Sequence, residues 1–129
     1  MIKILIVGAS APFSLETYYT EALRGLGADV RIVPVRSLFG DYYNRRTFNK
    51  IKFRFKLSGI YRKLNKILLT AFAEMKPDVV WIFKGMEVYP RTLQQLKQAG
   101  ALIVNFNPDH PFIFSAYGSG NRNVPSGLK

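Results

Sequence analysis

The chain has 129 residues with 19 Lys and Arg, 8 Asp and Glu, one His and no Cys, and its formal net charge is +11. A chain of this length is expected to form one domain with a real core, and its hydrophobic fraction of 48% excludes a mainly disordered chain. The lack of Cys excludes a disulfide framework, an iron–sulfur cluster and a thiolate zinc site, and no apolar run has the length of a membrane span, so we expect a cytoplasmic protein.

The beginning of the chain predicts a strand followed by a helix. Residues 2–7 form a nearly continuous apolar run, rich in β-branched side chains, that stops at Gly8 and is typical of a buried parallel strand. Ser14 is placed to cap a helix with apolar side chains at helical spacing, and Glu16 lies in its first turn, where an acid suits the helix dipole. Gly27 is placed to end that helix in a left-handed conformation.

The middle of the chain is less regular. Residues 30–35 predict a second short strand, but residues 36–50 show no clear pattern. Within residues 48–57, strict alternation of apolar and basic side chains is a strand signal, although a helical face also runs through the stretch. We leave that stretch open, favour a helix, and predict a further helix over residues 59–75.

Two more strands and a helix are expected in the second half. Pro77 ends the preceding helix, because proline disfavours a helical conformation at the residue before it. Residues 79–83 predict a third buried strand, and Pro90 is placed as the first residue of a helix. After Gly100, residues 101–106 predict a fourth strand.

Strands that alternate with helices indicate a parallel sheet covered by helices on both faces. We therefore predict an α/β fold, a Rossmann-like three-layer domain with a mainly parallel sheet of about four strands. This N-terminal domain is expected to span residues 1–110 and to carry a basic helical insert at 41–66. Residues 111–129, rich in Gly, Pro, Ser and Asn, are expected to form an irregular tail.

The positive charge is concentrated in the insert, which we call the basic segment. Residues 41–66 carry a net charge of +8, whereas the rest of the chain carries +3. Its bases are Arg45, Arg46, Lys50, Lys52, Arg54, Lys56, Arg62, Lys63 and Lys66. Such a patch attracts phosphate groups on nucleic acid, on lipid headgroups or on a substrate; the alternative is a solvated helix face that keeps the protein soluble.

The residues after each strand are the candidate binding site, because ligands of open parallel sheets bind at the carboxyl ends of the strands. Gly8 and Ser10 follow the first strand, where backbone amides could face an anion, and the alternative for Gly8 is a tight turn. Lys84 could meet a phosphate or an acceptor, or be a solvated strand end. Glu87 is a base or a cap of the next helix, and we favour the cap. We predict all four as substrate-binding positions.

Asp109 and His110 follow the fourth strand and are the predicted catalytic residues. An imidazole titrates near neutrality and is the commonest general base, while Asp109 could orient a water or act as the base itself. The alternative is a plain turn, which the surrounding Asn and Pro residues favour. One His without companion ligands predicts no metal site.

Nucleotide-binding motifs are missing from the first loop. Residues 8–13 read Gly-Ala-Ser-Ala-Pro-Phe, which is not the dinucleotide fingerprint G-x-G-x-x-G, and no P-loop sequence occurs. No acid closes the second strand to hold a ribose, which argues against a nicotinamide cofactor.

One continuous pattern in the second half resembles a known family. It comprises Lys76-Pro77-Asp78-Val79-Val80-Trp81-Ile82-Phe83-Lys84-Gly85, Pro90-Arg91-Thr92-Leu93, Leu96-Lys97, Ala99-Gly100 and Asn107-Pro108-Asp109. It resembles the N-terminal half of GT-B glycosyltransferases, in particular the CgeB-type spore-maturation group. The opening Lys3-Ile4-Leu5-Ile6-Val7-Gly8 and the turn Leu26-Gly27-Ala28-Asp29-Val30 are similar to that family's first strand and helix-to-strand turn.

The resemblance implies a two-domain enzyme that transfers a sugar in the cleft between its domains, without a tightly bound metal or cofactor. The N-terminal domain shapes the acceptor side, and the C-terminal domain holds the nucleotide-sugar, which is a co-substrate. We expect this chain to be the acceptor-side half, lacking the second domain and inactive without it.

Two interpretations of the basic segment are open. In a transferase it would contact an anionic acceptor or hold the enzyme at the inner face of an anionic membrane, where Phe48, Ile51, Phe53 and Phe55 among the bases would suit interfacial binding. The alternative is a non-enzymatic basic α/β module that binds nucleic acid or an anionic membrane surface.

Overall fold

Parallel strands form one sheet in the computed structural model, which describes residues 1–55 and 58–107. Within these residues the sheet has four strands in the order β2-β1-β3-β4. Their bounds are β1 Lys3–Val7, β2 Asp29–Val33, β3 Val79–Phe83 and β4 Leu102–Phe106. In the register, Leu5 of β1 lies opposite Arg31 of β2 and Val80 of β3. The sheet confirms the predicted α/β class and four strands at the predicted places, except that the second strand ends at Val33 and the residues predicted to continue it, Pro34 and Val35, begin a helix.

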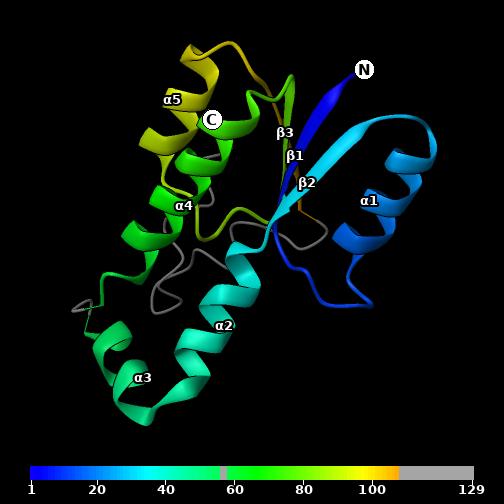
Figure 1. The fold of residues 1–129 in the computed structure, drawn as a ribbon. Helices are drawn as coiled ribbons and strands as arrows, with labels where there is room; N and C mark the ends of the chain where they lie inside the picture. The colour runs from blue at the N-terminus through cyan, green and yellow to red at the C-terminus, as the bar shows by residue number, and fades with distance from the viewer. Residues whose placement is uncertain (56–57, 108–129) are drawn as a thin grey trace.

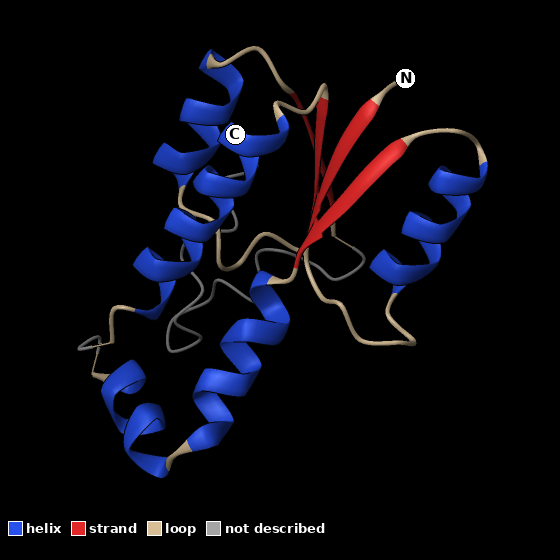
Figure 2. Ribbon diagram, viewed as in Figure 1, coloured by secondary structure: helices blue, strands red, loops and turns tan. Residues whose placement is uncertain are grey.

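Helices cover both faces of the sheet (Figure 1). Helix α1 (Leu15–Gly25) lies on one side, and α4 (Ile60–Met75) and α5 (Pro90–Gln98) lie on the other (Figure 2). This arrangement is the Rossmann-like three-layer domain that the alternation of strands and helices predicts.

The core has two parts because neighbouring residues of a strand point to opposite faces. Leu5 and Val7 of β1 belong to a buried cluster that includes Leu64 and Leu68 of α4 and Leu96 of α5. The alternate residues of β1, Ile4 and Ile6, belong to a second buried cluster with Val30 and Phe83. Strand β1 is thus buried on both faces, as its continuous apolar run predicts.

The predicted helix ends are confirmed. The hydroxyl of Ser14 accepts a hydrogen bond from the Thr17 amide at 3.3 Å, which is the N-cap of α1. Gly27 has a φ of 93°, a left-handed conformation that an L side chain adopts only with strain. Helix α4 ends in a less expected way, because Lys76 takes the left-handed C-cap position with a φ of 50°.

The stretch that has no clear pattern in the sequence forms two helices. Helix α2 spans Val35–Arg45 and α3 spans Thr47–Arg54, so the alternation within residues 48–57 does not form a strand in the described part of that stretch. The reason is an aromatic cluster in which the Phe53 ring packs edge-on against Phe39 and Tyr61 from the neighbouring helices. Helices α2 and α3 extend beyond the sheet and return the chain to α4 (Figure 1).

Candidate functional site

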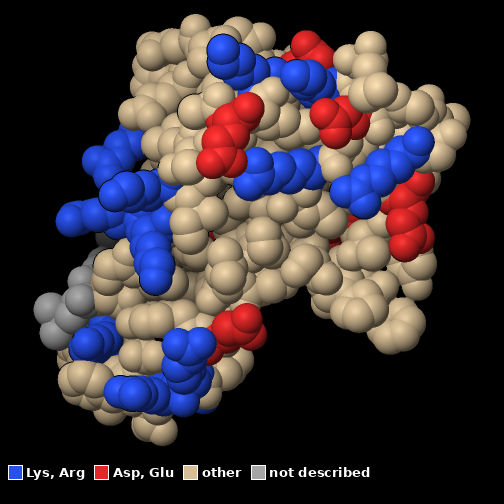
Figure 3. Space-filling view, in the orientation of Figure 1, with Lys and Arg blue, Asp and Glu red and all other residues tan. Residues whose placement is uncertain are grey.

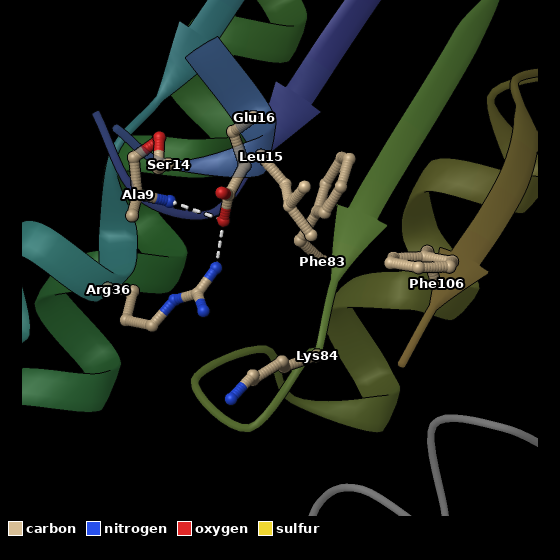
Figure 4. Close-up of a pocket in the computed structure, with 8 residues that line it drawn as sticks. All are labelled: Ala9, Ser14, Leu15, Glu16, Arg36, Phe83, Lys84 and Phe106. Atoms are coloured by element: carbon tan, nitrogen blue, oxygen red, sulfur yellow. Dashed lines mark hydrogen bonds and ion pairs between the residues drawn. The ribbon is translucent and has the colours of Figure 1, made fainter. Parts of the chain in front are cut away.

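A small pocket opens at the carboxyl ends of β1 and β3 (Figure 4). Its volume is about 170 Å³, and it is lined by Ala9, Ser14, Leu15, Glu16, Arg36, Phe83, Lys84 and Phe106. The chain passes from β1 to β2 on one side and later places β3 on the other side of β1, so the pocket lies where the strand order reverses. Ligands of open α/β sheets bind at such a switch point.

A buried carboxylate forms one wall of the pocket. Glu16 is 3% exposed, accepts a hydrogen bond from the Ala9 amide at 2.9 Å, and forms an ion pair with Arg36 (Figure 4). The position just after β1, at the start of a helix, is where many nucleotide-binding domains hold a phosphate. In this protein the carboxylate of Glu16 occupies that position. The sequence places Glu16 at the helix dipole but does not reveal its pairing with Arg36.

Gly8 is engaged by the protein rather than open to a ligand. Its amide donates to the carbonyl of Val33 at 3.1 Å, and its carbonyl accepts from the Arg36 amide at 2.9 Å. A Cβ at this position would lie 2.8 and 2.9 Å from Cγ and Cδ of Glu16, and closer still to Oε1. These contacts favour the tight-turn interpretation of Gly8. The next predicted position, Ser10, is exposed, and its amide donates to the hydroxyl of Ser37 at 3.0 Å.

Lys84 lies at the rim of the pocket, on the far side from Glu16 (Figure 4). It has a φ of 69° and is followed by Gly85 with a φ of 85°, so the backbone turns sharply as β3 ends. The Lys84 amide donates to the carbonyl of Phe106 at 2.8 Å, which ties this turn to β4. A non-glycine residue in a left-handed conformation costs energy and is often found at functional sites.

The prediction that Glu87 caps the next helix is wrong. Helix α5 has Tyr89 at its N-cap without a side-chain hydrogen bond, and Glu87 is 4% exposed. Asn65 of α4 bonds to the backbone of this loop: its side-chain nitrogen donates to the Glu87 backbone carbonyl at 2.8 Å, and its side-chain oxygen accepts from the Tyr89 amide at 2.9 Å. The loop between β3 and α5 is therefore held against α4.

Burial raises the pKa of the Glu87 carboxyl above its ordinary value. A hydrogen bond from its own backbone amide and the positive charges of Arg36 and Lys84 oppose that rise without cancelling it. Burial also raises the pKa of the Tyr61 phenol above its ordinary range, with smaller contributions from Glu87 and Tyr89. In the loop between β3 and α5, which we call the strand-end loop, the carboxyl group of Glu87 thus takes up a proton more readily than it would in water.

The predicted catalytic residues Asp109 and His110 lie outside the described residues, as do residues 111–129. Of the predicted substrate-binding positions, Lys84 lines the pocket, Gly8 and Ser10 adjoin it in the chain, and Glu87 lies in the following loop. Among residues 1–55 and 58–107, no cluster of three or more His, Asp or Glu residues could hold a metal ion.

Two structural roles in this region are not predicted from the sequence. They are the ion pair between the buried Glu16 and Arg36 and the hydrogen bonds by which Asn65 holds the loop after β3. Arg36 carries one available signal, since it lies just beyond the second strand at the edge where ligands bind. The pairing itself joins residues 20 positions apart and depends on the tertiary fold. Asn65 lies between Leu64 and Lys66 in the sequence and gives no such signal.

The basic segment is exposed to solvent over most of its length (Figure 3). Among its bases, those exposed are Arg45, Arg46, Lys50, Arg54, Arg62, Lys63 and Lys66, while Lys52 is half-buried and Lys56 lies outside the described residues. In this view Lys and Arg side chains gather over α3 and α4, away from most of the acids.

Comparisons with known proteins give no relatives: no protein-family model matches the chain, and neither a curated protein nor a solved structure matches it. Arguments about function therefore rest on the fold, on the pocket and on the sequence pattern of residues 76–109.

Proposed function

We propose that the chain is the acceptor-side half of a nucleotide-sugar-dependent glycosyltransferase of the GT-B type. The observation that carries this proposal is the position of the pocket, at the carboxyl ends of β1 and β3 and at the reversal of strand order. The resemblance of residues 76–109 to the CgeB-type group names the reaction class.

The lining of the pocket suits a small polyhydroxylated ligand. Phe83 and Phe106 offer aromatic surface, while Glu16, Arg36 and Lys84 offer charged hydrogen-bonding groups. In addition, Nε of Arg36 is buried and has no hydrogen-bond partner among the described residues. A hydroxyl or phosphate oxygen of an acceptor could accept from this guanidinium group.

The internal use of the first loop supports the acceptor side over the donor side. A domain that binds a nucleotide diphosphate presents free backbone amides after its first strand. Here the amide of Gly8 bonds to Val33 and that of Ala9 bonds to Glu16. The nucleotide-sugar would accordingly be held by a second domain, as in two-domain transferases.

In the complete enzyme a base near Asp109 or His110 would remove the proton of the acceptor hydroxyl as that oxygen attacks the anomeric carbon of the sugar. The bond between the anomeric carbon and the nucleotide phosphate then breaks, and the nucleoside diphosphate leaves. Glu87, with its raised pKa, lies in the loop between β3 and α5 and is a further group that could exchange a proton.

The proposal is tested by titrating the ¹⁵N-labelled chain with a panel of mono- and disaccharides and, separately, with UDP and UDP-glucose. We expect at least one saccharide to shift the amide resonances of Ala9, Lys84 and Phe106, and to lose this effect in Phe106→Ala. UDP should leave residues 8–10 unchanged. A panel without any saccharide response, or a UDP response centred on residues 8–10, contradicts an acceptor-side role.

A further inference from the structure

Helix α3 presents an apolar stripe to solvent. Phe48, Ile51 and Phe55 are 60%, 50% and 68% exposed, respectively. They are three and four positions apart, so they lie along one side of the helix. The helical turn includes Phe55, because its amide donates to the carbonyl of Ile51 at 3.1 Å. We call these three residues the α3 stripe.

The rest of the domain determines which way the α3 stripe faces. On the inner side of the helix, the Phe53 ring packs edge-on against Phe39 and Tyr61, with ring centroids 5.0 and 5.5 Å apart. On the same side, the Asn49 amide group donates to the carbonyl of Tyr42 at 2.8 Å. Because positions 49 and 53 are held inward, the α3 stripe is held outward by packing.

Cations flank the α3 stripe on both sides. The ammonium group of Lys52 lies 4.7 Å from the centroid of the Phe48 ring. Arg54 is exposed toward the other flank, and one helical turn before it the exposed Lys50 holds its ammonium group 5.4 Å from the centroid of the Tyr43 ring. The basic segment has a single acid, Asp41, which lies in α2. The α3 stripe therefore has cations beside it, and Lys and Arg side chains gather over α3 in the view of Figure 3.

We propose that the α3 stripe and its flanking cations dock the protein on a bilayer surface that contains anionic phospholipids. Phe and Ile side chains enter the boundary between headgroups and acyl chains, and Lys and Arg bind the lipid phosphates. The cations alone would also suit a nucleic acid, but the centre of the stripe is the aliphatic Ile51, which has no ring on which a base could stack. The docking surface is separate from the pocket and does not depend on the proposed reaction. Among the described residues, no helix has both the length and the apolar composition to cross a bilayer.

The test is cosedimentation of the full chain with phosphatidylcholine vesicles, with and without phosphatidylserine, over a range of salt concentrations. We expect binding that requires phosphatidylserine and weakens as salt rises. Lys50→Gln/Arg54→Gln should weaken it by roughly 30-fold, at about fivefold for each cation removed. Phe48→Ser/Phe55→Ser should weaken it by about tenfold or more.

Matched controls come from the same chain. Phe13→Ser removes a Phe that is 87% exposed but lies in the loop before α1, and Lys97→Gln removes an exposed cation on α5. Both should bind vesicles as the unchanged chain does. As a second measurement, Ile51→Trp in a Trp81→Phe background should show a blue-shifted emission with the vesicles and quenching by brominated lipid.

Several results would overturn the proposal. They are no binding to phosphatidylserine vesicles, equal binding to neutral vesicles, and an Ile51→Trp probe that stays in water. Binding that survives Phe48→Ser/Phe55→Ser, together with equally tight binding of duplex DNA, would assign the surface to nucleic acid instead.

Discussion

Replacing Gly8 by Ala tests whether the buried carboxylate of Glu16 organises the first loop. The added methyl group would lie 2.8 and 2.9 Å from Cγ and Cδ of Glu16, closer than carbon atoms in contact normally come. Glu16 is buried, so it can move away only by giving up its hydrogen bond from Ala9 and its ion pair with Arg36.

The size of the effect follows from those contacts. A hydrogen bond to a charged group contributes about 1.5–3 kcal/mol, and overpacking in a buried site costs about 1–3 kcal/mol. The protein will adopt the less costly of the two adjustments. We therefore expect Gly8→Ala to lower the free energy of unfolding by about 2 kcal/mol.

Urea denaturation followed by the fluorescence of Trp81, the one Trp of the chain, measures this change in the sheet itself. With an m-value of about 2 kcal/mol/M, the midpoint should fall by about 1 M. Gly25→Ala is the matched control: nothing lies within 4 Å of its added methyl group and it is the last residue of α1, so stability should stay equal or rise by up to about 1 kcal/mol.

A second comparison identifies Glu16 as the cause. In a Glu16→Ala background the added methyl group has room, so Gly8→Ala should cost little. The reasoning is refuted if Gly8→Ala stays within about 0.5 kcal/mol of the unchanged chain, or if its cost is the same with and without Glu16.

Three further predictions concern stability. Asn65→Ala leaves the polar backbone groups of the strand-end loop without partners and should cost about 1–3 kcal/mol in urea denaturation, whereas Thr70→Ala on the exposed side of α4 should change little. Because the pKa of Glu87 is raised in the folded state, its contribution to stability is present below the ordinary value of 4.5 and is lost as pH rises through the raised value. Glu87→Gln should therefore gain stability relative to the unchanged chain as pH rises from acidic to neutral. A stability difference between the two proteins that is constant with pH would contradict this. Lys76→Gly removes the side chain from a residue with a left-handed φ of 50° and should raise the stability measured by thermal unfolding by about 1 kcal/mol. The control Lys97→Gly, within α5, should lower stability by about 1 kcal/mol. If both variants were less stable than the unchanged chain, the left-handed residue would carry no strain.

The fold is predictable from the sequence because its two central strands, β1 and β3, are largely buried by helices on both faces of the sheet. Such strands need continuous apolar runs, and residues 79–83 show one bounded by Pro77-Asp78 and Lys84-Gly85. Helix α2 is harder to predict, because its Phe39 packs against Phe53 of α3 and Tyr61 of α4. The burial there comes from aromatic contacts among α2, α3 and α4, and a repeating pattern of apolar residues within one helix does not reveal such contacts.

The candidate site is predictable in position but not in its internal pairing. The rule that ligands bind at strand ends places Lys84 correctly at the pocket. The partnership of Glu16 with Arg36 joins the first turn of one helix to the first turn of another, and neither residue has a sequence neighbour that signals it. The backbone of the loop that contains Glu87 is likewise held by Asn65, which is 22 positions away in the sequence.

The two sides of helix α4 have different roles. Asn65 faces inward and holds the loop after β3, whereas Arg62 and Lys66 face solvent. Substitutions on the outer side can therefore change the charge of that surface while the loop keeps its hydrogen bonds. The attraction of this protein for a charged partner and the shape of its strand-end loop can consequently vary independently, in evolution or in the laboratory, within one helix of 16 residues.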